Sequence, residues 1–409
     1  MIAFAAAPAP ALAQDPQDHQ HEHANMPGMN DGTGWQFMQD GVVFALFNHQ
    51  GGPRGGNEGV APNWWMGMFT RAFGDSQLGF NTMFSLDPAT AGTRGYREIF
   101  QVGEAVDGRP LIDRQHPHDF FMQLSASWRT PINESTTLTI AGGPAGEPAL
   151  GPVAFMHRAS AAEYPFATLS HHTFDSTHIS FGVVTAAVER GPWTVEGSVF
   201  NGREPDQHRW DFDFAPLDSV SGRVWFRPSS EWEVQASTGR LVHPEELEPG
   251  NIQRTTVSAS WLRQDAGDFN AVTFGYGINA TDAAKRMAFF GEGTRHIGPD
   301  SAFVRMEVVQ VETNVLIADA IPADRASAAA SSTVAALTLG GVRDVLRVRG
   351  MDGGIGAAVT LHSVPDALKS TYGQHPVSFQ LFFRLRPPAG AMGRMWNRRM
   401  ASAPPMHPM

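Results

Sequence analysis

The stretch Glu231-Trp232-Glu233-Val234-Gln235-Ala236-Ser237-Thr238-Gly239 switches side-chain character at every second position. Successive residues of a β-strand point to opposite sides of the sheet, so a period of two predicts a strand with one apolar and one polar face. The same alternation returns in Gln77–Leu86, His118–Trp128, Thr177–Val188 and Ser301–Val311. The sequence therefore predicts an all-β protein.

Alternation and turn-forming residues together place about sixteen strands. Short turns such as Gly74-Asp75-Ser76 and Glu189-Arg190-Gly191 alternate with long loops such as 87–117 and 143–176. The 280–284 connection is shorter than this pattern predicts, and the turn in 344–352 is longer. The strands are expected at 35–47, 64–73, 77–86, 118–129, 135–142, 177–188, 192–201, 218–227, 231–240, 253–263, 268–279, 285–294, 301–312, 332–343, 353–363 and 377–386.

An even number of strands with alternating short and long connections is typical of an outer-membrane β-barrel. A sheet can face lipid only when it is closed, because an open edge leaves backbone groups unpaired. The tryptophans at the short-turn ends fit an interfacial girdle, namely Trp35, Trp128, Trp193, Trp232 and Trp261.

A soluble β-sandwich also has alternating strands. However, a sandwich of 409 residues would divide into several domains, and neither a boundary nor a repeat of fixed period is visible. We therefore predict one porin-like transmembrane antiparallel β-barrel of about 16 strands, spanning residues 35–386 and located in the bacterial outer membrane.

The composition excludes several classes of protein. The chain has no Cys, which excludes zinc fingers, thiolate catalysis and iron–sulfur ligation. Its formal net charge of -11 argues against a nucleic-acid partner, since binding phosphates requires a basic surface. Residues 1–13 end in Ala11-Leu12-Ala13, a small-x-small pattern that we interpret as the remnant of an export signal. Residues 14–34 are expected to form a disordered linker in the periplasm.

Both tails carry soft or imidazole donors. The linker offers His19, His21 and His23 followed by two methionines, and the tail 387–409 is rich in methionine. Thioethers suit Cu(I) and imidazoles suit Cu(II). Such short tracts are a compositional hint to copper, and an incidental polar linker fits them equally well.

Two polar runs stand beside predicted strands. The first is Asp113-Arg114-Gln115-His116-Pro117-His118-Asp119, and the second is Ser170-His171-His172-Thr173-Phe174-Asp175-Ser176-Thr177-His178. With a periplasmic N-terminus, both long loops lie outside, and Asp119 and His178 fall on the lumen side of their strands. Imidazole and carboxylate together suit copper or zinc. The candidate ligands are His116, His118, Asp119, His157, His171, His172, Asp175 and His178.

Two other interpretations remain for these runs. Arg114 and Arg158 stand beside the carboxylates, which favours a hydrogen-bonded network that pins a loop into the lumen. Ser170, His171 and Asp175 suggest an outer-membrane hydrolase, although the chain lacks a Gly-x-Ser-x-Gly elbow and a His-Glu-x-x-His motif. The charged stretch 201–213 is interpreted as a structural loop and not as a calcium site, because EF-hand spacing is absent.

The two histidine runs together resemble a family of uncharacterised bacterial outer-membrane proteins with a DRQHPHD motif, over most of the chain. That resemblance implies a barrel and no proven activity. The tail composition with an exported barrel also resembles the copper-resistance B family of outer-membrane proteins. This second resemblance implies copper handling.

We therefore expect a barrel that binds or passes a small solute, with a transition metal ion such as copper as the first candidate. The alternative is a general porin-like diffusion channel with a loop folded into the pore. The expected partners are outer-membrane lipid, the solute or metal ion, and periplasmic metal-handling proteins. No enzymatic activity is expected.

Overall fold

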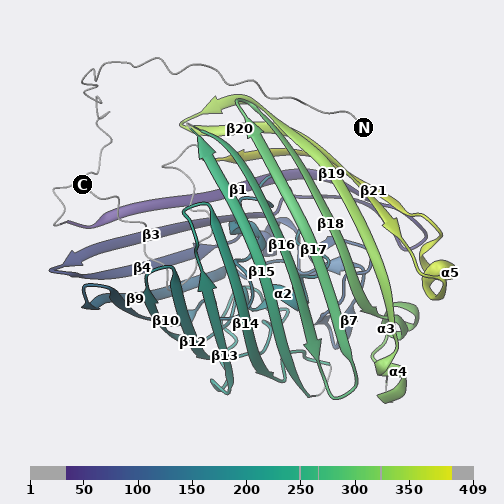
Figure 1. The fold of residues 1–409 in the computed structure, drawn as a ribbon. Coiled ribbons are helices and arrows are strands. Elements are labelled where there is room, and N and C mark those ends of the chain that lie inside the picture. The colour runs from purple at the N-terminus through teal and green to yellow at the C-terminus, as the bar shows by residue number, and fades with distance from the viewer. Residues whose placement is uncertain (1–33, 248–249, 266, 323–324, 389–409) are drawn as a thin grey trace, which may run out of the picture.

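The computed structural model describes residues 34–247, 250–265, 267–322 and 325–388, and its main sheet is a closed barrel (Figure 1). Each barrel strand pairs antiparallel with the next along the chain, and the last strand pairs with the first. The sixteen barrel strands are β1 (Gln36–Gln50), β3 (Asn63–Phe73), β4 (Ser76–Phe84), β9 (Phe121–Asn133), β10 (Thr136–Ala145), β11 (Val183–Arg190), β12 (Trp193–Phe200), β13 (Ser219–Phe226), β14 (Trp232–Val242), β15 (Asn251–Asp265), β16 (Asp268–Ala280), β17 (Lys285–Ile297), β18 (Asp300–Glu312), β19 (Ser331–Val348), β20 (Met351–Ser363) and β21 (Val377–Arg386).

Strand β1 pairs with β21 along one edge, which closes the barrel, and with β3 and one short strand along the other. Residues Val43–His49 of β1 pair with β21, while its first half pairs with β3. A further short strand, β2 (Gly56–Val60), pairs with the second half of β1. The predicted fold, a porin-like antiparallel barrel, is confirmed.

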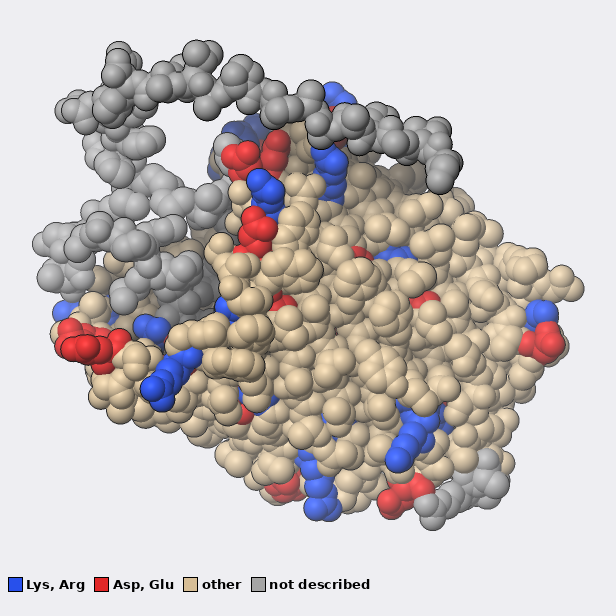
Figure 2. Space-filling model, in the orientation of Figure 1, with Lys and Arg blue, Asp and Glu red and all other residues tan. Residues whose placement is uncertain are grey.

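Alternation along the strands gives the barrel an apolar outside and a polar inside. In β12, Val195 and Val199 are exposed, whereas Thr194, Glu196 and Ser198 are buried. On the face seen in Figure 2, most charged side chains lie toward the ends of the molecule and leave an uncharged surface between them. This distribution fits an outer surface in contact with lipid.

Four tryptophans beside the short turns are exposed on the outside, as the girdle prediction requires. Trp35, Trp128, Trp193 and Trp232 are each between 41% and 49% exposed. Trp261 lies opposite Trp232 in the pairing of β14 with β15. None of the helices in the described part of the chain has the length and apolar character needed to span a membrane.

Several predicted boundaries shift by three or more residues, and three of them concern the loops and turns discussed below. The strands expected from His118 and Thr177 begin at Phe121 and Val183. Residues 118–120 are irregular, and the Phe120 amide donates to the Arg209 carbonyl instead of to a neighbouring strand. Before β11, residues Ser176–His178 form a short helical turn, and Gly182 has a φ of 97°. The long turn expected in 344–352 is a tight one, because β19 continues to Val348.

The long loops contain short elements of their own. Two small hairpins form by pairing of β5 with β8 and of β6 with β7. The bounds of these elements are β5 (Tyr96–Arg97), β6 (Glu104–Val106), β7 (Arg109–Leu111), β8 (Arg114–Gln115), α1 (Asp87–Thr90), η1 (Phe155–His157), α2 (His171–Phe174), η2 (Ser176–His178), α3 (Thr313–Ala318), α4 (Arg325–Ala329), η3 (Asp366–Leu368) and α5 (Lys369–Tyr372).

Residues 146–182, the inward loop, fold into the barrel. Backbone hydrogen bonds between Gly146 and Ser180 close its base. Every residue from Pro148 to Phe181 is buried except His172, which is half-buried. Its helix α2 contacts β15 and β16 and lies within the ring of strands in Figure 1. The lumen is therefore filled by the protein's own chain over much of its length.

Buried ion pairs attach the inward loop to the barrel wall. Arg158 Nε donates to Glu292 Oε1 of β17 at 2.7 Å, and both side chains are 1% exposed. Farther along the loop, Glu163 forms ion pairs with Arg384 and Arg386 of β21. Removing one partner of a buried pair leaves an uncompensated charge, so these contacts hold the loop in place.

The predicted signal remnant (1–13) and the two tails (14–34 and 387–409) lie outside the described residues, apart from Gly34, Pro387 and Pro388. Their assignments stay predictions.

We predict that Glu163→Gln loosens the inward loop, because Arg384 and Arg386 lose their fully buried carboxylate partner and keep only Asp344, which is 14% exposed. The cost should be about 3–5 kcal/mol of loop attachment. Hydrogen exchange of residues 146–182 should accelerate. Glu189→Gln is the matched control, since the side chains of Glu189 and of its partner Arg129 are each 29% exposed. Equal exchange rates of residues 146–182 in Glu163→Gln and Glu189→Gln would contradict the role of Glu163 in attaching the inward loop.

Candidate metal-binding site

Five histidines from two loops meet inside the barrel. His116 and His118 come from the loop before β9, and His171, His172 and His178 come from the inward loop. The ring centroid of His171 lies 5.4 Å from that of His116 and 5.3 Å from those of His172 and His178. His118 lies 5.4 Å from His178. We call these five residues the histidine cluster, with His171 at its centre.

Local backbone structure sets the spacing of the second run. The amide of Asp175 donates to the carbonyl of His171 at 3.0 Å, and the amide of His178 donates to the carbonyl of Asp175 at 3.0 Å. One helical turn brings residues four apart onto the same side. His171 and Asp175 therefore face each other, while His178 turns back toward the same centre.

Each imidazole of the cluster has its Nδ1 atom against an oxygen acceptor. Because an ionised carboxylate or a carbonyl accepts only, Nδ1 is the protonated nitrogen, and Nε2 carries the lone pair. The acceptors are Asp175 Oδ1 for His171 at 2.8 Å, Asp87 Oδ2 for His118 at 2.8 Å, Glu204 Oε1 for His172 at 3.1 Å, the Asp175 carbonyl for His178 at 2.7 Å, and the Pro117 carbonyl for His116 at 3.2 Å.

Three of the opposite nitrogens have no partner. The Nε2 atoms of His116, His171 and His178 are buried and form no hydrogen bond. A buried acceptor without a partner costs about 1–3 kcal/mol. Imidazoles that bind metal ions show the same arrangement, with Nδ1–H on a carboxylate or carbonyl and Nε2 free for the ion.

The surroundings keep these rings neutral. Burial lowers the pKa of His116 well below its usual value, and the charge of Arg209 adds to the effect. Burial also lowers the pKa of His171, although Asp175 opposes it, and lowers the pKa of His178 strongly. Neutral imidazole is the form that binds metal ions, so no proton has to be displaced at neutral pH.

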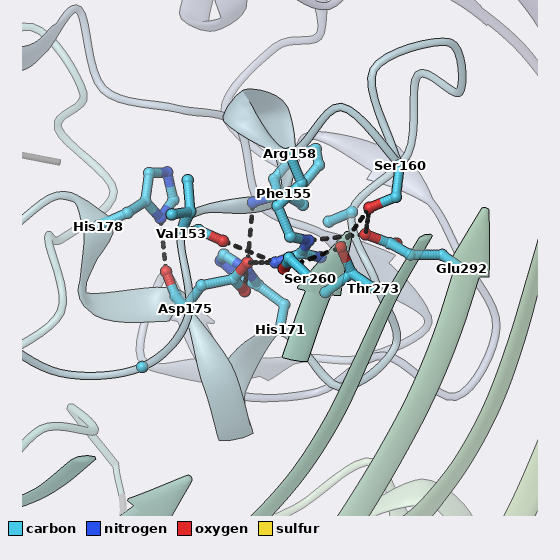
Figure 3. Close-up of polar contacts among 12 residues, drawn as sticks. Val153, Phe155, Arg158, Ser160, His171, Asp175, His178, Ser260, Thr273 and Glu292 are labelled. Carbon is cyan, nitrogen blue, oxygen red and sulfur yellow. Dashed lines mark hydrogen bonds and ion pairs between the residues drawn. The ribbon is translucent and has the colours of Figure 1, made fainter. Parts of the chain in front are cut away.

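The two candidate carboxylates belong to arginine networks. Asp119 Oδ2 accepts from Arg209 Nη1 at 3.2 Å, and burial raises the pKa of Asp119 to about 6 against the effect of Arg209. Asp175 Oδ2 accepts from Arg158 Nη1 at 3.0 Å (Figure 3). Burial would raise the pKa of Asp175, but the His171 bond and the Arg158 charge hold it below its usual value. Both carboxylates position neighbouring groups, as the loop-pinning interpretation expected.

The remaining residues of the two runs lie elsewhere. The His157 ring packs on Trp64, with 4.9 Å between the centroids. Arg114 Nη2 donates to Glu58 Oε2 at 3.1 Å, and Asp113 pairs with Arg54 at 2.7 Å. These contacts tie the first run to the mouth of the barrel. The structure therefore brings together five of the eight candidates, with Asp175 beside them.

Two sets of three donors in the described ranges have ligand atoms within 4.8 Å of one another. One set is His172, Glu204 and Glu245, and the other is Asp206, Asp211 and Asp213. The other four histidines of the histidine cluster belong to neither set. Their rings have to reorient for three Nε2 atoms to share one ion.

Four partners of the cluster were not singled out by the sequence analysis. Asp87 and Glu204 accept from histidines, Glu104 Oε1 lies 3.0 Å from His116 Nδ1, and Arg209 pairs with Glu104 and Asp119. These four residues lie in long loops without periodicity, so the direction of their side chains could not be predicted from the sequence. The ion pairs of Arg209 fit the structural interpretation of the 201–213 stretch, because they link it to the loop before β9.

The hydrolase interpretation needs a hydroxyl on a histidine nitrogen. His171 offers none, since its Nδ1 meets Asp175 and its Nε2 forms no hydrogen bond. His296 Nδ1 lies 2.8 Å from Ser301 Oγ near the short turn between β17 and β18, where the His296 ring stacks on Phe269. That pair is remote in sequence from both histidine runs.

No protein-family model matches the chain, and a search of curated proteins gives no match. Solved structures are similar over most of the barrel. OprB of Pseudomonas putida has a TM-score of 0.52 at 9% identity, covering 87% of this chain and 94% of its own.

A loop L8 deletion mutant of OmpT, an outer membrane protein of Vibrio cholerae, has a TM-score of 0.51 at 9% identity, covering 86% of this chain and 99% of its own. The anion-selective porin of Comamonas acidovorans has a TM-score of 0.50 at 9% identity, covering 86% and 100%. Identities this low establish a shared barrel fold and carry no information about the solute. They do not test either family resemblance.

We predict that Arg209→Gln destabilises the first histidine run, because Glu104 and Asp119 lose a buried cation. The local free energy of unfolding should fall by about 3–5 kcal/mol. Hydrogen exchange of residues 113–120 measures it. Arg203→Gln, in the same loop but in a half-exposed pair with Asp218, should change it by less than about 1 kcal/mol. A larger effect of Arg203→Gln would contradict this assignment.

Proposed function

We propose that this chain is an outer-membrane barrel that binds a transition metal ion inside its lumen, at the histidine cluster, in metal homeostasis or resistance. The observation that carries the proposal is the state of His116, His171 and His178. Each ring has its Nδ1 atom against an acceptor and its Nε2 atom buried without a partner. Neutral imidazoles suit copper, zinc, nickel and iron.

The ring spacing supports one shared ion. Metal–nitrogen bonds are about 2.0–2.1 Å long, so two imidazoles on one tetrahedral ion have centroids roughly 5 Å apart. The centroids of His116 and His178 lie 5.4 and 5.3 Å from that of His171. Copper is our first choice, because the tails add imidazole and thioether donors.

A filled lumen favours a small ion over a larger solute. Gln380 and Arg384 on the inner face of β21 are 0% exposed, and Gln235 on β14 is 1% exposed. An open channel would leave such side chains in contact with water. An ion small enough to pass between packed side chains fits this interior. A periplasmic metal-handling protein is the partner that such a barrel would serve.

The second candidate is a general porin-like diffusion channel, which the barrel fold and the inward loop favour. It requires the loop to leave a continuous water-filled path. Planar-bilayer conductance separates the two functions. Steady conductance that copper or zinc does not alter supports diffusion, and block by micromolar metal supports binding in the lumen.

We predict that His171→Ala with His178→Ala removes one tightly bound ion. Full-length protein in detergent is titrated with Cu²⁺ and with Zn²⁺, and the bound ions are counted. Loss of two ligands should weaken binding at this site by more than the ~10–100-fold typical of losing a supporting residue. His375→Ala, on an exposed loop, is the control. Unchanged affinity in a variant with an intact β-sheet spectrum would refute the site.

A further inference from the structure

A cavity opens at the outer mouth of the barrel, next to the histidine cluster. Its volume is about 590 Å³, and we call it the vestibule. Its lining contains five carboxylates, Glu104, Glu204, Asp206, Glu245 and Glu246. Arg203 also lines it, but the Arg203 guanidinium is paired with Asp218. Glu104 is paired with Arg209, and the buried guanidinium of Arg254 faces Glu204 and Glu245, so the remaining carboxylates give the vestibule a moderate excess of negative charge that attracts cations.

Three loops place donors together at this cavity. The inward loop supplies His172, the loop before β13 supplies Glu204, and the loop after β14 supplies Glu245. One ligand atom of each lies within 4.8 Å of the others. His172 can lie here because residue 103 is glycine, since an added Cβ atom would stand 2.4 Å from Nδ1 of the ring.

A second observation points to a missing cation. The Glu204 side chain is only 7% exposed, and its Oε2 atom is buried without a hydrogen bond. Its Oε1 atom already accepts from His172 Nδ1 at 3.1 Å. The buried guanidinium of Arg254 acts on Glu204 through its charge, but it donates its hydrogen bonds to Ser176 and to the His172 carbonyl. The Glu204 Oε2 atom is left without a donor, and a bound cation would supply that contact.

We infer that His172, Glu204 and Glu245 form a second, divalent-cation site in the vestibule, through which ions reach the histidine cluster. One imidazole with two carboxylates suits a first-row divalent ion such as Mn²⁺, Fe²⁺ or Zn²⁺. His172 joins the two sites, because its ring lies 5.3 Å from His171 and 5.6 Å from His116. The existence of the cation site is argued from its own three ligands. Its role in delivering ions to the histidine cluster rests on the proposed function.

The other close donor set does not compete for this role. Asp206 and Asp211 are exposed, and Asp213 is half-buried. Asp213 Oδ2 already accepts from the Asp206 amide at 3.0 Å. That set therefore serves as a control.

Mn²⁺ tests the vestibule site, because it prefers oxygen ligands and binds imidazole clusters weakly. Electron paramagnetic resonance counts the ions bound to full-length protein in detergent. Glu204→Gln with Glu245→Gln should lose one bound Mn²⁺, whereas Glu246→Gln and Asp211→Asn should retain it. Glu245→Gln alone keeps the buried contact between Glu204 and His172 and should weaken binding about 10-fold. Undiminished Mn²⁺ binding in Glu245→Gln and in the double variant would overturn the site.

Stopped-flow measurement of Cu²⁺ loading tests the route. At low salt, Glu245→Gln with Glu246→Gln should load about 10-fold more slowly, because two lining charges that steer cations are lost, with unchanged affinity at the histidine cluster. An unchanged loading rate would overturn the route. Failure of the proposed function gives a different result: His171→Ala with His178→Ala would leave Cu²⁺ affinity intact, while the Mn²⁺ result still decides the vestibule site.

Discussion

The pairing of β21 with β1 is the constraint on which the rest of the structure depends. Lipid offers no hydrogen bonds, so a sheet that crosses a membrane must leave no edge unpaired. Closure makes one face of every strand an outer face and the other an inner face. The lumen that results is shielded from lipid, and polar or charged side chains can be directed into it.

The inward loop turns this enclosure into a folded interior. Because it fills the lumen, its polar groups must be satisfied by the wall, and Arg158, Glu163 and Arg305 meet that requirement. The same need for hydrogen bonds orients the histidines, whose Nδ1 atoms contact carboxylates and carbonyls. Three Nε2 atoms of the cluster and one carboxylate oxygen of Glu204 are among the buried polar atoms that the chain leaves without a hydrogen bond, and these four have lone pairs that a metal ion can use.

The strands could be predicted from the sequence because a period of two and a tight turn are local signals. The histidine cluster could be predicted only as a list of residues. Strand parity assigned His178 to the lumen, yet the residue reaches the interior from a short helical turn. His157 met the same compositional criterion and packs on Trp64 instead. Acceptors such as Glu204 come from a loop whose direction depends on the closed barrel.

The anchoring of the inward loop also implies an order of events during folding. Arg158 and Glu292 are separated by 134 residues, and Glu163 and Arg386 by 223. Contacts of such separation carry a high loop-closure entropy, which falls once the intervening strands are paired. The loop belongs to the first half of the barrel, but its anchors belong to the second. The histidines therefore take their final positions only after the last strand has been added, so the binding site matures together with the completed wall.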